Sequence, residues 1–191
     1  LLANREVATF VSEKIGKKNP LFVYRIHDVP NAEKLDGLGA FLSAIGYQLS
    51  LGKKTTAKDI NRVLKESEGS AQERLIKTAT IRSMAKAIYT TKNIGHFGLA
   101  FENYAHFTSP IRRYPDVMVH RALETLLSGK QITEKPEDIE ARAIHATARE
   151  VSAAEAERAS VKLKQVEYFA DKIGEEREGA VSVVTEWGLY I

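Results

Sequence analysis

Residues 101–121 read FENYAHFTSPIRRYPDVMVHR, and no simple helix or strand period explains this stretch. It combines aromatic rings, hydroxyls and an arginine pair: Phe101, Tyr104, Phe107 and Tyr114, then Thr108 and Ser109, then Arg112 and Arg113. Guanidinium groups match phosphate oxygens and aromatic faces accept stacked bases, so this set suits a nucleic-acid backbone. The alternative is a core segment with a salt-bridged arginine pair, and composition alone favours it because most aromatic residues serve cores.

Part of this stretch, residues 105–116 with His120 and Arg121 after them, resembles the signature of the ribonuclease II and ribonuclease R family. Other segments resemble the RNB catalytic domain of that family in the same order, namely residues 1–4, 24–27, 82–84 and 95–99. Arg-Arg-Tyr-Pro at 112–115 resembles the ribonuclease R branch, since the other branch typically has Arg-Lys-Tyr-Gly. We call residues 101–121 the signature segment.

The hydrophobic pattern predicts a chain that is mostly helical. Helices are expected over residues 3–15, 31–45, 59–66, 70–89, 114–127 and, with breaks, 136–173; strands are expected over 21–26 and as a pair within 179–191. The first helix should end at Gly16, and Ser70 with Glu73 should form a capping box. Apolar stripes are expected at Ala3, Val7, Val11 and Ile15 and at Leu75, Ile76, Ala79 and Met84.

The resemblance turns this pattern into a domain prediction of the α+β class, predominantly helical. Residues 1–174 would be the C-terminal part of an RNB-type catalytic domain. Residues 175–191, which include GAVSVVTEWGLYI, resemble the first strands of an OB-fold RNA-binding domain. Because the chain opens on Leu1-Leu2 within a helix, we expect it to be a fragment of a longer protein.

Composition limits the possible classes of function. The 191 residues are 43% hydrophobic and 28% charged, which is typical of a soluble globular protein, and the formal charge of +3 permits nucleic-acid binding without arguing for it. The absence of cysteine excludes disulfides, thiolate nucleophiles and cysteine-based zinc sites, and fits a reducing compartment. With no apolar run of membrane length, these features predict a cytoplasmic protein without a membrane partner.

The resemblance assigns two catalytic candidates. Arg112 matches the arginine that holds the phosphate at the scissile bond, where it would stabilise charge that develops on a phosphoryl oxygen. Glu157 matches a glutamate on the long helix after the signature, which could orient the reactive arginine or a metal-bound water. A structural ion pair is the alternative for Arg112, and a solvated helix charge is the alternative for Glu157.

Further residues of the signature segment are predicted to contact single-stranded RNA. They are His106, Thr108, Ser109, Arg113, Tyr114 and Arg121. Because the family accepts lysine at the position of Arg113, this residue could supply general positive charge rather than a specific contact. For His106 and His120 we favour structural hydrogen bonding over metal or acid–base chemistry. For Asp116 we favour a place in the first helical turn or a pairing with arginine.

The resemblance also implies a reaction, in which a processive 3′→5′ exoribonuclease hydrolyses single-stranded RNA to nucleoside 5′-monophosphates with Mg²⁺. The family holds its metals with an aspartate cluster that has no counterpart here, so no metal ligand is assigned and the chain alone is expected to be inactive. Two alternatives remain: a catalytically inactive family member that acts as an RNA-binding regulator, and a helical interaction module.

Overall fold

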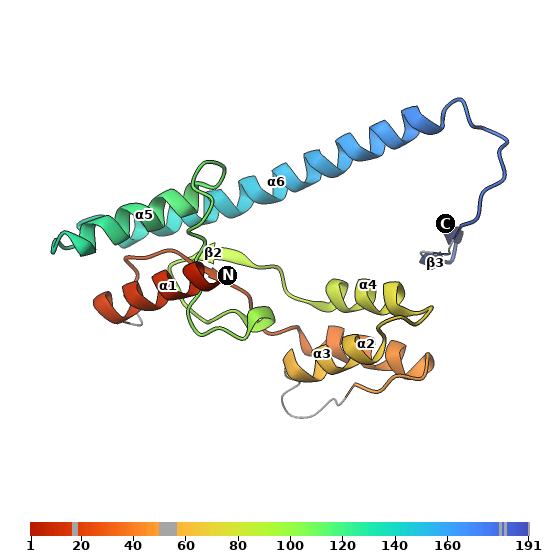
Figure 1. Ribbon diagram of the computed structural model, residues 1–191, viewed down its shortest axis with the longest axis horizontal. Helices are drawn as coiled ribbons and strands as arrows, with labels where there is room; N and C mark the ends of the chain where they lie inside the picture. Colours follow the sequence, from red (N-terminus) through yellow and green to blue (C-terminus); the bar gives the residue numbers. More distant parts are fainter. Residues whose placement is uncertain (17–18, 50–56, 180, 182, 191) are drawn as a thin grey trace. The chain divides into compact units, whose positions relative to one another are not determined.

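The computed structural model describes residues 1–16, 19–49, 57–179, 181 and 183–190. The chain divides into two compact units, Leu1–Arg149 and Glu150–Ile191, and the boundary falls within one long helix. Figure 1 shows mostly helices with a few short strands, so the prediction of a predominantly helical α+β fold is confirmed. None of the helices in these ranges has the length and apolar character needed to cross a membrane.

The first unit contains one small antiparallel sheet among its helices. In chain order its elements are α1 (Leu2–Ile15), β1 (Tyr24–Ile26), α2 (Ala32–Ala44), α3 (Ala57–Glu66), α4 (Glu73–Ser83), β2 (Ile88–Thr90), the 3₁₀ helix η1 (Phe97–Leu99), α5 (Tyr114–Leu127) and the first part of α6 (Pro136–Phe169). β1 pairs with β2 so that Tyr24 lies opposite Thr90. The strand expected over 21–26 is therefore confined to its second half.

α1 ends where the sequence predicts but buries a different face. Gly16 adopts φ 91 and donates its backbone N–H to the Ser12 carbonyl, a conformation that favours glycine. The predicted stripe began at Ala3, but Ala3 is exposed and the buried face begins at the polar residue Asn4 and continues through Ala8 and Val11. The face is rotated because Asn4 finds hydrogen-bond partners in the signature segment.

The segment α2–α4 forms a second hydrophobic cluster of its own, built on Leu38, Leu42, Leu49, Ile60, Val63 and Ile76. Asn31 caps α2 as predicted, accepting a hydrogen bond from the Glu33 N–H at 2.8 Å. The predicted capping box of α4 is wrong in detail, because the Glu73 carboxylate accepts from the Gly69 N–H at 2.9 Å rather than from Ser70. Leu75, placed in the buried stripe, is 41% exposed.

α4 also ends at Ser83, well before Tyr89, where the helix was expected to end. Tyr89 instead lies in β2 with its side chain 3% exposed, and its backbone N–H donates to the Thr147 hydroxyl at 2.9 Å. Strand pairing and burial of this ring therefore override the helical preference of the segment before it.

α5 and α6 follow the predicted boundaries closely at their starts. α5 covers Tyr114–Leu127 and is followed by Gly129 at φ 70, as expected. α6 begins at Pro136 and continues without a break to Phe169, because this stretch contains no glycine or further proline to interrupt it. The predicted breaks in this helix were wrong.

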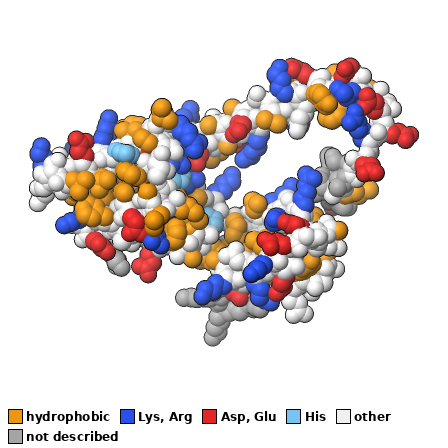
Figure 2. Space-filling model, viewed as in Figure 1, with side chains coloured by type: hydrophobic (Ala, Val, Ile, Leu, Met, Phe, Trp, Pro, Cys, Tyr) orange, Lys and Arg blue, Asp and Glu red, His pale blue; other side chains and the backbone are white. Residues whose placement is uncertain are grey.

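The main core of the first unit lies where α1, the sheet, α5 and the start of α6 meet. Its fully buried members include Val11, Phe22, Tyr24 and Val119, and Ile139 and Ala143 belong to it from α6. This core fixes both ends of the signature segment, since Ala105 and Met118 are also part of it. Figure 2 shows basic and acidic side chains interspersed over the visible face rather than gathered into one patch.

The second unit consists of the rest of α6 and a short hairpin. β3 (Val183–Thr185) pairs antiparallel with β4 (Gly188–Tyr190) across a two-residue connection, Glu186 and Trp187. The strand–turn–strand pattern expected within 179–191 is therefore present in the residues that are described there. Between Val151 and Phe169 the side chains of α6 are exposed, apart from that of Ala154.

Candidate nucleic-acid interface

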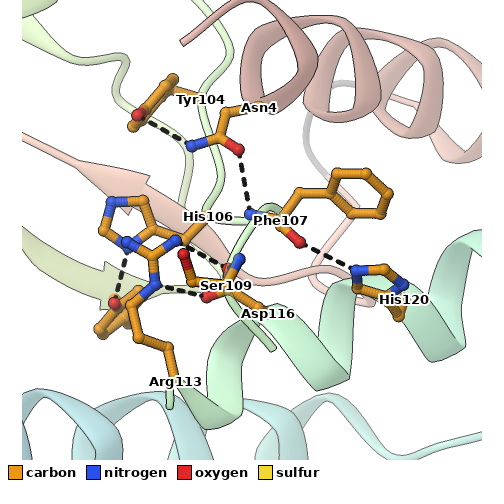
Figure 3. A network of polar contacts seen from close by, with 9 residues as sticks. Asn4, Tyr104, His106, Phe107, Ser109, Arg113, Asp116 and His120 are labelled. Atoms are coloured by element: carbon orange, nitrogen blue, oxygen red, sulfur yellow. Dashed lines mark hydrogen bonds and ion pairs between the residues drawn. The ribbon is translucent and has the colours of Figure 1, made fainter. Parts of the chain in front are cut away.

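The first part of the signature segment, residues 101–113, is irregular and connects η1 to α5, whereas residues 114–121 belong to α5 itself. β1 holds the first half of the segment through the Arg25 N–H, which donates to the Tyr104 carbonyl at 2.9 Å. Asn4 of α1 holds it with both ends of one amide: Nδ2 donates to the Tyr104 hydroxyl at 3.0 Å, and Oδ1 accepts from the Phe107 N–H at 3.3 Å (Figure 3). The path of the segment is thus fixed by long-range hydrogen bonds rather than by secondary structure.

A buried carboxylate fixes the second half of the segment. Asp116, in the first turn of α5, is completely buried and accepts three hydrogen bonds (Figure 3). The Ser109 N–H donates to Oδ1 at 2.7 Å, and the Arg113 guanidinium donates through Nε to Oδ2 at 2.9 Å and through a terminal nitrogen to Oδ1 at 2.8 Å. The expectation that Asp116 pairs with an arginine is confirmed.

Residues 109–113 form a turn whose middle faces outwards, and we call it the arginine turn. The Arg112 and Arg113 N–H groups both donate to the Ser109 carbonyl, at 3.3 and 3.1 Å. Ile111 is 98% exposed and Arg112 is exposed beside it. Over the described ranges, the Arg112 guanidinium has neither a hydrogen bond nor an ion pair. Of the two adjacent arginines, it is Arg113 that forms an ion pair, with Asp116. The structural ion pair considered for Arg112 is therefore made by its neighbour.

The histidines of the segment are engaged in contacts within the protein. Nδ1 of His106 lies 2.8 Å from the Tyr89 hydroxyl, and burial, helped by Arg113 and Arg25, lowers the pKa of His106 to about 4. Nε2 of His120 lies 2.9 Å from the Phe107 carbonyl, and the two rings stack with centroids 4.1 Å apart. These contacts agree with the structural, hydrogen-bonding role expected for both histidines.

The other candidate residues are distributed between surface and interior. Thr108, Tyr114 and Arg121 are exposed in the first unit, while Ser109 is half-buried and its N–H is taken by Asp116. Glu157 is an exposed residue of α6 in the second unit. The described part of the chain contains no group of three or more histidine or acidic side chains that could hold a metal ion.

Two structurally important residues were not singled out from the sequence. Asn4 sits in an apolar helix pattern, and only its burial reveals that it holds the signature segment. Glu140 of α6 accepts hydrogen bonds from the Thr91 N–H at 2.6 Å and from the hydroxyls of Thr91 and Thr90 at 2.7 and 2.9 Å. Burial alone would raise the pKa of Glu140, but these hydrogen bonds more than offset it and lower the pKa.

Several known ribonucleases R are similar to this chain in sequence. Residues 1–129 match the RNB domain family. Ribonuclease R of Aquifex aeolicus is 38% identical over 171 residues, which cover 88% of this chain and 24% of the relative. Ribonuclease R 1 of Lactococcus lactis is 41% identical over 175 residues, which cover 89% of this chain and 21% of the relative. The chain therefore spans about a quarter of the length of the curated relatives that it matches.

Solved structures extend the likeness to the fold. The apo form of Mycoplasma genitalium ribonuclease R superposes with a TM-score of 0.88 at 25% identity, covering 98% of this chain and 30% of that one. The same enzyme in complex with ribose-methylated single-stranded RNA gives a TM-score of 0.87 at 24% identity, with the same two coverages. The yeast pseudonuclease Ssd1 gives 0.64 at 26% identity, covering 75% of this chain and 18% of that one.

The family match covers the same part of the chain as the fold that holds the signature segment. The family match includes α1, the sheet, the α2–α4 segment and α5, and so contains every element that holds the arginine turn. The chain thus belongs to the RNB domain family, and its relatives along nearly its whole length are ribonucleases R.

Proposed function

We propose that this chain supplies the phosphate-holding part of a processive 3′→5′ exoribonuclease, which hydrolyses single-stranded RNA to nucleoside 5′-monophosphates in the cytoplasm. The observation that carries the proposal is the exposed guanidinium of Arg112, which has no ion-pair or hydrogen-bond partner among the described residues, on a turn whose two ends are fixed. A guanidinium offers a planar fork of donors that fits two phosphate oxygens, and it stays charged at any physiological pH.

The surroundings of Arg112 support RNA as the ligand. Thr108 and Tyr114 are exposed on the same segment. The Thr108 hydroxyl can therefore donate a hydrogen bond to an oxygen of the RNA backbone, and the Tyr114 ring can stack on a base. Contacts of these kinds read the phosphate, the sugar and the flat faces of the bases, which every RNA sequence offers. The proposed enzyme therefore binds its substrate without sequence preference.

Magnesium is proposed for the complete enzyme, but the described residues do not fit a magnesium site. Mg²⁺ requires several convergent oxygen ligands, whereas both oxygens of Asp116 already accept hydrogen bonds from Ser109 and Arg113, and Glu157 is an exposed helix residue. We therefore assign no metal ligand in this chain and derive no catalytic step through the metal. The residues present bind and orient the RNA phosphate, and Glu157 is proposed as a catalytic residue by its match to the family.

The proposal is tested first by RNA binding at several salt concentrations. Arg112→Ala should weaken binding of the chain to all single-stranded RNAs alike, and should reduce the slope of log affinity against log salt by about 0.7, the value for one neutralised phosphate. Arg74→Ala, which removes another exposed positive charge from α4, is the matched control and should have a smaller effect. Equal losses of RNA affinity in the two variants would show that Arg112 contributes only non-specific positive charge.

A second measurement separates binding from catalysis in a complete enzyme that contains this chain. If Arg112 stabilises charge in the transition state, Arg112→Ala should lower turnover on the order of a hundredfold or more. Arg112→Lys should rescue turnover poorly, because lysine keeps the charge and loses the fork. Turnover that stays intact at saturating RNA, with reduced affinity, would assign Arg112 to substrate positioning alone.

An RNA-binding family member without catalytic activity is the second candidate, and the likeness to a yeast pseudonuclease gives it a specific basis. Both candidates predict the same binding results, so release of nucleoside monophosphates by the complete protein decides between them. The third candidate, a helical interaction module, predicts no RNA binding at all. It would gain support if affinity for RNA were absent even at low salt.

A further inference from the structure

We infer that Asp116 is a positioning residue that directs Arg112 towards the RNA phosphate, and that Arg113 serves this carboxylate instead of the RNA. The inference rests on the proposed function, because it requires Arg112 to be the phosphate ligand. It also reverses the simplest interpretation of the sequence, in which two adjacent arginines act together as a positive patch.

The first support is the set of donors that Asp116 receives. Its three hydrogen bonds come from Ser109 and Arg113, which are the first and last residues of the arginine turn. One rigid carboxylate therefore ties together the two ends of a five-residue loop. Asp116 is a buried residue of α5, and the same helix contributes Met118 and Val119 to the main core, so the tie is anchored on a helix that the core fixes.

The second support is burial. The Asp116 side chain is 0% exposed and that of Arg113 is 21% exposed, whereas Arg112 and Ile111 between the tied ends are open to solvent. A buried carboxylate is stable as an anion only when its partners remain in place, so the pair fixes the Arg113 fork and withdraws it from RNA. The remaining free fork of this turn is that of Arg112.

The third support concerns the cost of binding. The tied turn restricts the backbone on both sides of Arg112, and Pro110 fixes one more dihedral angle within it. Less conformational freedom is then lost when Arg112 engages a phosphate. Releasing the tie would leave the charge of Arg112 unchanged and make its position variable.

A positioning role for Asp116 predicts a change in RNA affinity opposite in sign to that expected from net charge alone. Asp116→Asn removes one negative charge and loosens the hold on Arg113. If the turn were only a positive patch, this variant would bind the RNA polyanion more tightly. If Asp116 positions Arg112, the variant should bind more weakly despite its higher positive charge.

The experiment measures binding of a labelled single-stranded oligouridine to the full chain in a double-mutant cycle. Asp116→Asn should weaken binding about threefold or more in the wild-type background and leave it unchanged in the Arg112→Ala background, the signature of coupled residues. Glu73→Gln is the charge-matched control, since Glu73 pairs with Lys77 on α4, and it should not weaken binding. Melting temperatures establish that each variant is folded.

Arg113→Lys provides a second route if Asp116→Asn does not fold. It keeps the charge and one hydrogen bond to Asp116 but loses the two-point fork, so binding should weaken only while Arg112 is present. Unchanged or tighter binding by the folded variant, or an equal loss in both backgrounds, would overturn the positioning role. If Arg112→Ala itself leaves binding unchanged, the proposed phosphate site fails instead, so the two failures are distinguishable.

Discussion

Arg112 and Arg113 are neighbours in the chain, and their guanidinium groups lie in different environments. Arg113 donates two hydrogen bonds to a buried carboxylate, while Arg112 is exposed. The family resemblance pointed to this pair and predicted Arg112 as the phosphate ligand. The residue types alone could not show which of the two arginines forms hydrogen bonds within the protein. That choice depends on Asp116 entering the core, which is a property of the tertiary structure.

The imidazoles of His106 and His96 make stability depend on pH. Burial is the main reason that the pKa of each is lowered to about 4, below the value near 6.5 of an unfolded chain. The unfolded state therefore binds protons first. The stability these residues provide is complete above about pH 6.5 and is lost as pH falls towards 4.

We expect the urea midpoint of unfolding to decrease between pH 7 and pH 5, and His106→Gln to reduce that dependence because glutamine does not titrate. His145→Gln is the matched control, because His145 is exposed on α6 and should leave the dependence unchanged. A decrease of the same size in the double variant His96→Gln/His106→Gln would assign the pH dependence to other groups.

Among the helices and strands, the boundaries predicted from the sequence were most accurate where neighbouring residues determine them. Gly16 and Gly129 mark helix ends, Asn31 caps α2 and Pro136 starts α6, all as expected. The errors arise where distant parts of the chain decide. α4 ends early because Tyr89 joins the sheet, and the buried face of α1 is set by a hydrogen bond between Asn4 and residue 107.

Glu140 joins α6 to the end of β2, and its removal should loosen that junction. Glu140→Gln replaces a carboxylate that accepts from two hydroxyls and one backbone N–H by an amide with a single acceptor oxygen. Hydrogen bonds to charged groups contribute more than neutral ones, so we expect the free energy of unfolding to fall by about 1 to 2 kcal/mol. Urea denaturation would measure this change.

The control for this variant is Glu155→Gln, an exposed site on the same helix, where a change within about 0.5 kcal/mol is expected. Equal effects at the two sites would show that the Glu140 contacts contribute no net stability.

The chain contains the arginine turn and the elements that hold it, but it spans about a quarter of the length of the curated relatives that it matches. The resemblance in the sequence was sufficient to identify the family, because its signature is long and its segments occur in order. The relation between Arg112 and Glu157 could not be predicted in this way, since they belong to separate compact units.

We predict that the 191-residue chain alone releases no nucleoside monophosphates from a labelled single-stranded RNA in the presence of Mg²⁺. Hydrolysis of this type needs metal ions held by convergent carboxylates. Of the two acids closest to family positions, Asp116 already accepts hydrogen bonds from Ser109 and Arg113, and Glu157 is an exposed residue of the other compact unit. Thin-layer separation of the products would measure release. Activity abolished both by a chelator and by Glu157→Gln would reveal a complete metal site within the chain.

The burial of α6 at only one end affects how the helix unfolds locally. Its 34 residues rise about 51 Å, yet its buried side chains, Ile139 and Ala143, lie within its first turns. We expect backbone amides near these residues to be protected from hydrogen exchange until the main core opens, and those beyond Arg149 to exchange through fraying of the exposed part of the helix. One continuous helix thus spans a gradient of local stability, and its exposed part can unwind and re-form while the arginine turn remains in place.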